Sequence, residues 1–513
     1  MGLGAGCYSA GANAYKVSGS SVEMMSADGF APRRMEPFPT DREDYNHIEE
    51  SDFFVAADFP LSTFSVDVDT ASYSNARRFL SRRQLPPADA VRIEEMINYF
   101  EYDYAEPAGP HPFSVTAEIG TCPWNEAHQL VHVGIQGKHV ELDEVPSRNL
   151  VFLIDVSGSM DSEDKLGLLK KSLSMLADQL RPQDSVAIVV YAGASGLVLP
   201  PTNDKRQIKK ALRRLDAGGS TAGAAGLALA YQVARRNFED GAINRVIMAS
   251  DGDLNVGPSS QGELVDLIEE YRESGVFLSI LGYGSGNLND ALMEQVADHG
   301  NGHYAYIDSE KEARRVLVEQ VNATLVPIAA DVKLQVEFNP AKVEAYRLVG
   351  YENRALDAQD FNDDRKDAGE IGAGHSVTAL YEVVPAGAGE FEGSVDPSRY
   401  QTDSTTTAAA TASSETMFVK IRYKNPGEAN SQLVEQAVDL PTLPLADTSD
   451  DFRFSAAVAG FGMLLRDSEH KGDVSYRKVR TLAKGALGRD PREVRREFVD
   501  LVGEAAEITR RRG

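Results

Sequence analysis

The sequence is poor in cysteine, tryptophan and positive charge. Its 513 residues include only two cysteines, Cys7 and Cys122, and one tryptophan. The cysteines lie far apart in the sequence, so neither a disulfide framework nor a cysteine-based zinc site is supported. Two such residues leave the redox compartment open.

Basic residues are outnumbered by acidic ones. The chain has 52 Lys and Arg against 78 Asp and Glu, a formal net charge of -26 at pH 7. A surface of this sign repels phosphate backbones and anionic lipid. We therefore expect no nucleic-acid partner.

Long hydrophobic runs are missing as well. The longest uncharged apolar run, FSAAVAGFGMLL at 454–465, is shorter than the roughly 20 residues that a membrane-spanning helix needs. The sequence predicts no transmembrane span. Its hydrophobic content of 42% is ordinary for a globular protein, and its length is typical of about two to four domains.

The opening stretch MGLGAGC places Cys7 after small residues, as at the end of a bacterial lipoprotein signal. No apolar stretch precedes it, although such a signal needs roughly 7 to 15 apolar residues, and Leu3 stands one position too early for the usual lipobox. Two interpretations stay open. Either the start is truncated and Cys7 is a lipid anchor, or the stretch is a flexible cytoplasmic tail.

The pattern of residues changes along the chain. Residues 1–45, rich in Gly, Ser, Ala and charge, are expected to be a disordered tether or the remnant of an export signal. Residues 46–146 carry helical and strand-like stretches of an α+β region. Residues 147–326 alternate strands and helices. Residues 327–513 are β-rich with closing helices, and their low-complexity segment 402–415 is expected to be a flexible loop.

Residues 147–326 have the pattern of a doubly wound domain. NLVFLID at 149–155 is continuously apolar, as a strand buried on both faces requires. Strands alternating with helices imply right-handed crossovers and a mostly parallel sheet covered on both faces. The predicted fold class is therefore α/β, with this Rossmann-like sheet flanked by the α+β N-terminal region and the β-rich C-terminal domain.

Polar residues gather where the predicted parallel strands end. Asp155, Ser157 and Ser159 follow the first strand, Thr221 lies in the GGST loop, and Asp251 follows the strand RVIMAS. Ligands of doubly wound sheets bind outside the carboxyl ends of the strands, so these residues are expected to converge at one rim. Their hydroxyl and carboxylate oxygens are hard ligands that suit Mg2+, and also Ca2+ or Mn2+.

Two carboxylates and three hydroxyls leave much of a dication's charge unquenched. Such a site wants one more acidic oxygen from outside the chain. We expect Asp155, Ser157 and Ser159 to be direct ligands and Thr221 and Asp251 to be direct or water-mediated ones. The alternative is that Asp155 and the serines cap the following helix, but capping needs only one of them.

The DVSGS run, the GGST loop and the SDGD run together resemble the von Willebrand factor type A (VWA) domain and its metal-ion-dependent adhesion site. In that family D-x-S-x-S is followed by a threonine and an aspartate, here Thr221 and Asp251. FSVDVDTASYSNARRFL, RIEEMINYF and VVYAGASGLVLPPT are further similar to the bacterial YfbK-like group, over roughly residues 45–510.

The resemblance implies metal-dependent protein binding, in which an acidic side chain of an unidentified partner completes the coordination sphere. Members of the group are often exported or lipid-anchored, which favours the cell envelope and a truncated signal before Cys7. Some bacterial VWA proteins are instead cytoplasmic partners of AAA-type ATPases. That role is the alternative.

An enzymatic hypothesis starts from SVDVDTASY. Asp67 and Asp69 are faintly similar to the nucleophile loop of haloacid-dehalogenase-type phosphatases, but Thr70 comes one position too early. No obvious general base accompanies the rim. A metal-dependent phosphatase with Asp67 as its nucleophile therefore ranks well below a non-enzymatic binding module, and a capped strand-to-helix turn explains these aspartates better.

Overall fold

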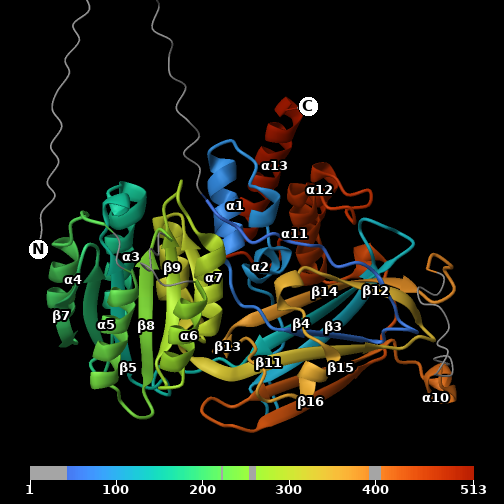
Figure 1. Ribbon diagram of the computed structural model, residues 1–513. Coiled ribbons are helices and arrows are strands. Elements are labelled where there is room, and N and C mark those ends of the chain that lie inside the picture. Colours follow the sequence, from blue (N-terminus) through green and yellow to red (C-terminus); the bar gives the residue numbers. More distant parts are fainter. Residues whose placement is uncertain (1–42, 221–222, 253–260, 392–405, 513) are drawn as a thin grey trace, which may run out of the picture. The chain divides into compact units, whose positions relative to one another are not determined.

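Three β-sheets organise the part of the chain that the structure describes. The computed structural model describes residues 43–220, 223–252, 261–391 and 406–512. The chain divides into two units, residues 1–40 and residues 41–513. All three sheets belong to the larger unit (Figure 1).

One sheet has six strands in the order β10-β9-β8-β5-β6-β7. Its neighbours pair in parallel except β6 and β7, which are antiparallel. The predicted doubly wound, mostly parallel sheet is thereby confirmed. The strands are β5 (Arg148–Asp155), β6 (Ser185–Tyr191), β7 (Ser195–Thr202), β8 (Ile243–Ser250), β9 (Phe277–Tyr283) and β10 (Tyr304–Ile307).

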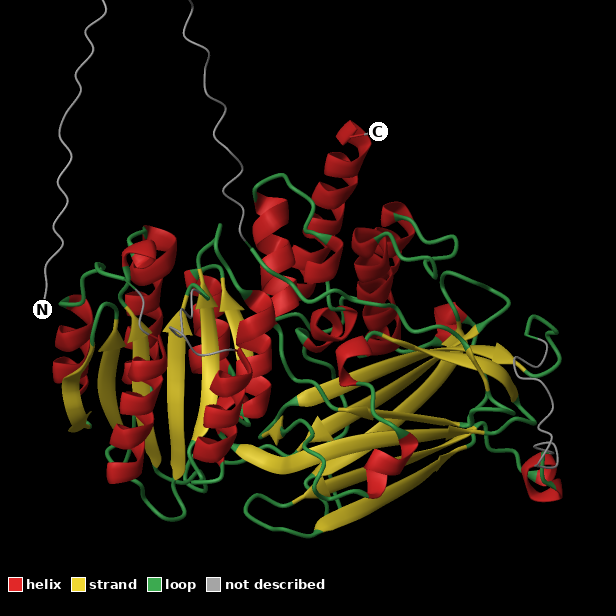
Figure 2. Ribbon diagram, in the orientation of Figure 1, coloured by secondary structure: helices red, strands yellow, loops and turns green. Residues whose placement is uncertain are grey.

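Apolar side chains alternate across β5 and bury both faces of this sheet. Phe152 and Ile154 lie in one hydrophobic core, whereas Val151 and Leu153 lie in another. Successive strand residues point to opposite faces, so a strand covered on both sides needs an apolar residue at each position. Figure 2 shows the covering helices, which are α3 (Leu168–Asp178) and α4 (Lys205–Arg213) over the first core, and α5 (Gly223–Arg236), α6 (Gln261–Arg272) and α7 (Asp290–His299) over the second.

Two antiparallel sheets share a further core. Their orders are β1-β12-β14-β4-β3 and β13-β11-β15-β16, and β2 also pairs with β11. Val133, Leu334 and Ile421, from β4, β11 and β15, lie in the common core. The strands are β1 (Phe54–Val55), β2 (Leu61–Ser65), β3 (Phe113–Thr121), β4 (Gln129–Gly137), β11 (Pro327–Phe338), β12 (Val343–Val349), β13 (Ile371–Gly372), β14 (Ser376–Pro385), β15 (Met417–Lys424) and β16 (Ser431–Val438).

Strands from both ends of the described chain build these antiparallel sheets. β4 pairs with β14, and β2 pairs with β11. Residues 46–146 and 327–513 therefore contribute strands to the same two sheets, although the doubly wound sheet separates them in the sequence.

Longer helices from both ends of the described chain pack into a helical cluster. Ile97, Phe454 and Phe498 lie in its core. Ser74 of α1 donates its hydroxyl to the Tyr306 carbonyl of β10 at 2.7 Å, so α1 lies against the outermost parallel strand. The helices are α1 (Ala71–Ser81), α2 (Ile93–Asn98), α11 (Asp450–Arg466), α12 (Tyr476–Lys484) and α13 (Val494–Arg512).

Shorter helical turns complete the fold. Within the predicted loop 402–415, residues 402–405 lie outside the described part and α10 occupies Ala408–Ala412. No helix among the described residues is long and apolar enough to cross a membrane. The other turns are η1 (Ala88–Ala90), η2 (Gly158–Met160), η3 (Glu163–Gly167), α8 (Glu310–Arg314), η4 (Arg315–Glu319), α9 (Val321–Leu325), η5 (Glu352–Arg354), η6 (Ala358–Asn362) and η7 (Leu445–Asp447).

Candidate metal centre

The end of β5 places the first predicted ligand in a buried position. All eight residues of this strand are buried, and Asp155 is its last residue. One carboxylate oxygen of Asp155 accepts the backbone N–H of Ser157 at 2.8 Å, and the other accepts the hydroxyl of Ser250 at 3.0 Å. These two hydrogen bonds hold the Asp155 side chain in one orientation, at the edge of the sheet where the parallel strands have their carboxyl ends.

The two serines lie in the turn that follows. Their hydroxyl oxygens are 2.9 Å apart, with Ser157 buried and Ser159 exposed to solvent. Ser157 begins the turn η2 without a side-chain capping bond. The helix-capping interpretation is thus left to the Asp155 carboxylate alone, and it does not account for the pair of hydroxyls.

A glycine loop closes against the serine turn. Gly158 donates its N–H to the Gly219 carbonyl at 3.0 Å, and Gly218 donates to the Val156 carbonyl at 2.8 Å. Gly219 has φ of +91°, a conformation that favours glycine. These bonds bring the GGST loop to the rim. Thr221 itself lies outside the described residues.

Asp251 follows β8, the parallel neighbour of β5, and therefore emerges at the same edge. The residue is fully buried. Its Oδ2 accepts from Lys165 Nζ at 2.9 Å and from Asn287 Nδ2 at 3.0 Å, and its carboxylate also bonds the Ser159 hydroxyl. The structure thus brings together Asp155, Ser157, Ser159 and Asp251.

The two carboxylates differ in their electrostatics. Burial raises the pKa of Asp155 to about 6, and the negative charge of Asp251 acts in the same direction. Burial also raises the pKa of Asp251, but the Asn287 hydrogen bond and the Lys165 charge outweigh it and hold that pKa below its usual value. A cation already stands beside Asp251, whereas Asp155 has none of the described cations as an ion-pair partner.

Lys165 and Asn287 were missed from the sequence. Lys165 lies in η3 and is buried, and its Nζ donates to the Asn287 side chain at 2.7 Å as well as to Asp251. Its position just before the apolar face that starts at Leu166 was the available signal. From the sequence alone, a lysine at this position is expected to be exposed to solvent at the end of that face. It is expected to be covered only if the loop after β9 is known to lie over it.

The other polar candidates have structural partners. Asp67 pairs with Arg354 at 3.2 Å, and Asp69 accepts the Tyr304 backbone N–H at 2.8 Å. Both aspartates are buried, so Asp67 has little access to a substrate.

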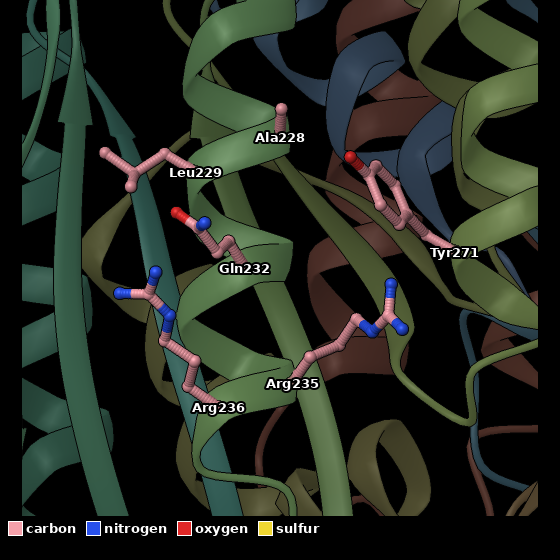
Figure 3. Close-up of a pocket in the computed structure, with 6 residues that line it drawn as sticks. All are labelled: Ala228, Leu229, Gln232, Arg235, Arg236 and Tyr271. Carbon is pink, nitrogen blue, oxygen red and sulfur yellow. The ribbon is translucent and has the colours of Figure 1, made fainter.

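No group of three or more His, Cys, Asp or Glu among the described residues could hold a metal. The four candidate residues that the structure describes at the rim include only two carboxylates, Asp155 and Asp251, and so do not form such a group. A surface hollow of about 630 Å³ lies over α5. Unlike the rim, it is lined by basic and aromatic side chains, among them Arg235, Arg236 and Tyr271 (Figure 3). Its lining includes none of the four predicted ligands that the structure describes.

A doubly wound sheet with carboxylate and hydroxyl groups where β5 and β8 end defines a protein with a VWA domain. Residues 150–253 match the family described as von Willebrand factor type A domain, and residues 39–132 match one described as von Willebrand factor. Proteins with VWA domains generally mediate protein interactions and are generally not enzymes.

The relationship can be made more specific. Residues 323–508 match the family described as uncharacterized protein YfbK, C-terminal. The uncharacterized protein YfbK of Escherichia coli K12 is 44% identical over 478 residues, which are 91% of this chain and 81% of that protein. The chain belongs to the YfbK family of VWA proteins.

More distant similarities cover parts of the chain. The human inter-alpha-trypsin inhibitor heavy chain H3 is 26% identical over 180 residues, which are 33% of this chain and 20% of that protein. The solved structure of a von Willebrand factor type A protein from Catenulispora acidiphila is 17% identical, with a TM-score of 0.41. That match covers 75% of this chain and 89% of the other.

Proposed function

We propose that the rim formed by Asp155, Ser157, Ser159, Thr221 and Asp251 binds a divalent cation, Mg2+ foremost, and through it an acidic side chain of a partner protein. The supporting observation is the convergence of four of these residues, with the two serine hydroxyls 2.9 Å apart. The atoms of these residues that would bind the cation are all oxygens, which hard cations prefer.

The charges at the rim also fit a cation. Two buried carboxylates lie close enough for the charge of Asp251 to raise the pKa of Asp155. Placing a dication between them would relieve this repulsion. Because the hydroxyl ligands are neutral, the bound ion would retain charge for an incoming carboxylate.

Removal of the two hydroxyls tests the proposal. In the Ser157→Ala/Ser159→Ala variant, isothermal titration calorimetry with Mg2+ or Mn2+ should detect no binding, while the far-UV circular dichroism spectrum stays unchanged. The matched control is Ser162→Ala/Ser174→Ala, which removes hydroxyls that bond Asp164 and the Lys170 carbonyl instead. Equal metal affinity in the wild type and the Ser157/Ser159 variant would refute the proposal.

The cellular location is a separate proposal, which rests on the position of Cys7 after small residues. We place the protein at the cell envelope, with Cys7 as a lipid anchor, and residues 1–42 lie outside the described part. A pull-down from an envelope extract should recover the acidic partner in Mg2+ and lose it in EDTA. Recovery that does not respond to EDTA would exclude a metal-bridged contact.

A further inference from the structure

The backbone near Lys165 leaves room for its side chain to reach the rim. Its side chain passes beside Gly284, where a Cβ atom would lie only 2.3 Å from Lys165 Cγ. Gly284 also has φ of +75°, so both the space and the conformation require glycine there. The turn after β9 thus leaves a passage that the lysine stem fills.

The ammonium group ends between two oxygen acceptors. It donates to Asp251 Oδ2 at 2.9 Å and to Asn287 Oδ1 at 2.7 Å, while Asn287 donates to the same Asp251 oxygen at 3.0 Å. The lysine side chain is 9% exposed and the Asp251 side chain is 0% exposed. Screening by water is weak at such a position, so the pair interacts strongly.

The position of Lys165 changes the charge that a dication would meet. Asp155 and Asp251 together carry two negative charges when ionised, and the ammonium cancels one of them. The remaining single negative charge attracts a divalent cation less than two would. An outside carboxylate restores the missing negative charge.

We propose that Lys165 makes cation binding at the rim depend on the acidic partner. The inference rests on the proposed function and concerns the regulation of the same site. The ammonium keeps the affinity for the bare cation low, and a carboxylate from the partner and the cation bind together and strengthen one another. By linkage, the cation strengthens binding of the partner by the same factor as the partner strengthens binding of the cation.

The test removes the charge of Lys165. Calorimetry of the full chain with Mn2+ should give at least tenfold tighter binding in Lys165→Met than in the wild type. Lys165→Gln, which keeps a hydrogen-bond donor on a side chain one atom shorter and removes the charge, should change in the same direction. The matched control is Lys171→Met, which removes an exposed lysine paired with Glu310 and should leave Mn2+ affinity within twofold.

A carboxylate probe tests the dependence itself. Acetate, compared with chloride at equal ionic strength, should tighten Mn2+ binding to the wild type by several-fold and to Lys165→Met by much less. Mn2+ affinity that is unchanged or weaker in both Lys165 variants overturns the inference and leaves the proposed function standing. If neither the wild type nor any variant binds Mn2+, the proposed function fails and the inference fails with it.

Discussion

His132 is a buried histidine that the fold keeps neutral. It lies on β4, its Nε2 is 2.8 Å from the Tyr104 hydroxyl, and its ring packs edge-on against Phe452. Burial lowers its pKa from 6.5 to about 4, although the negative charge of Asp451 acts in the opposite direction. The unfolded chain therefore binds a proton at this residue at a higher pH than the folded one does.

This difference in proton binding predicts a loss of stability in acid. As the pH falls from about 6.5 to about 4, protonation stabilises the unfolded state only, so the free energy of unfolding drops by up to about 3 kcal/mol from this residue. In His132→Gln, urea unfolding followed across this range should show a shallower decline. The control is His47→Gln, which removes an exposed histidine paired with Asp89. An unaltered decline in His132→Gln would contradict the assignment.

At the residue scale, four of the five rim residues could be located from the sequence because of how parallel sheets work. Asp155 is the last residue of one apolar strand and Asp251 follows another, and the carboxyl ends of neighbouring parallel strands meet at one edge. Lys165 could not be found in this way. Its contact with Asp251 depends on how a flexible side chain passes Gly284, which is distant in sequence.

At the element scale, α5 lies close to β6 because a glycine faces the strand. A Cβ atom at Gly226 would lie 2.6 Å from the Cβ atom of Tyr191, which cannot move without the strand backbone. Tyr191 is in turn paired across the sheet with Asp155. The spacing between this helix and this strand thus supports the position of the first rim residue.

Gly226→Ala should therefore destabilise the protein even though alanine favours helices. We expect the free energy of unfolding to fall by about 1–3 kcal/mol, as overpacked cores do. The control is Gly503→Ala in α13, where the nearest atoms lie 3.6 Å or more from the new Cβ and belong to the Arg480 side chain. There the change should stabilise by up to about 1 kcal/mol. Chemical denaturation of both variants measures the difference, and stabilisation by both would show that α5 can move away from β6.

The positions of the strands could be predicted from the sequence better than the pairing between them. The apolar run of β5 and the β-rich pattern of residues 327–513 indicated strands, and strands are found there. Pairing of β2 with β11 and of β4 with β14 joins segments more than 200 residues apart. Periodicity in one segment reports which face is buried, and it carries no information about which distant strand covers it.

At the scale of the whole described unit, Arg77 joins three parts of the sequence. Its guanidinium, on α1, binds Asp308 after β10 through two bonds of 2.7 Å, and it also bonds Glu312 of α8 at 2.7 Å and Glu497 of α13 at 2.8 Å. Burial raises the pKa of Glu312, but the charges of Arg315 and Arg77 outweigh it and lower that pKa to about 2. Glu312 therefore remains ionised at neutral pH.

Arg77→Met should weaken both the stability and the cooperativity of this unit. It leaves Asp308, whose side chain is only 9% exposed, without its arginine partner, and removing one side of a buried ion pair lowers the free energy of unfolding by about 3–5 kcal/mol. The control Arg82→Met removes a half-exposed arginine 3.7 Å from Asp164, and it should lower the free energy of unfolding by less than about 1 kcal/mol.

Trp124 is the single tryptophan and is buried with the helical cluster, so its fluorescence follows that part while far-UV circular dichroism follows the whole chain. In the wild type and in Arg82→Met the two urea transitions should coincide, whereas in Arg77→Met they should separate, because the helical cluster no longer shares this link with the doubly wound sheet. Coincident transitions with an unchanged midpoint in Arg77→Met would show that contacts other than those of Arg77 couple the parts.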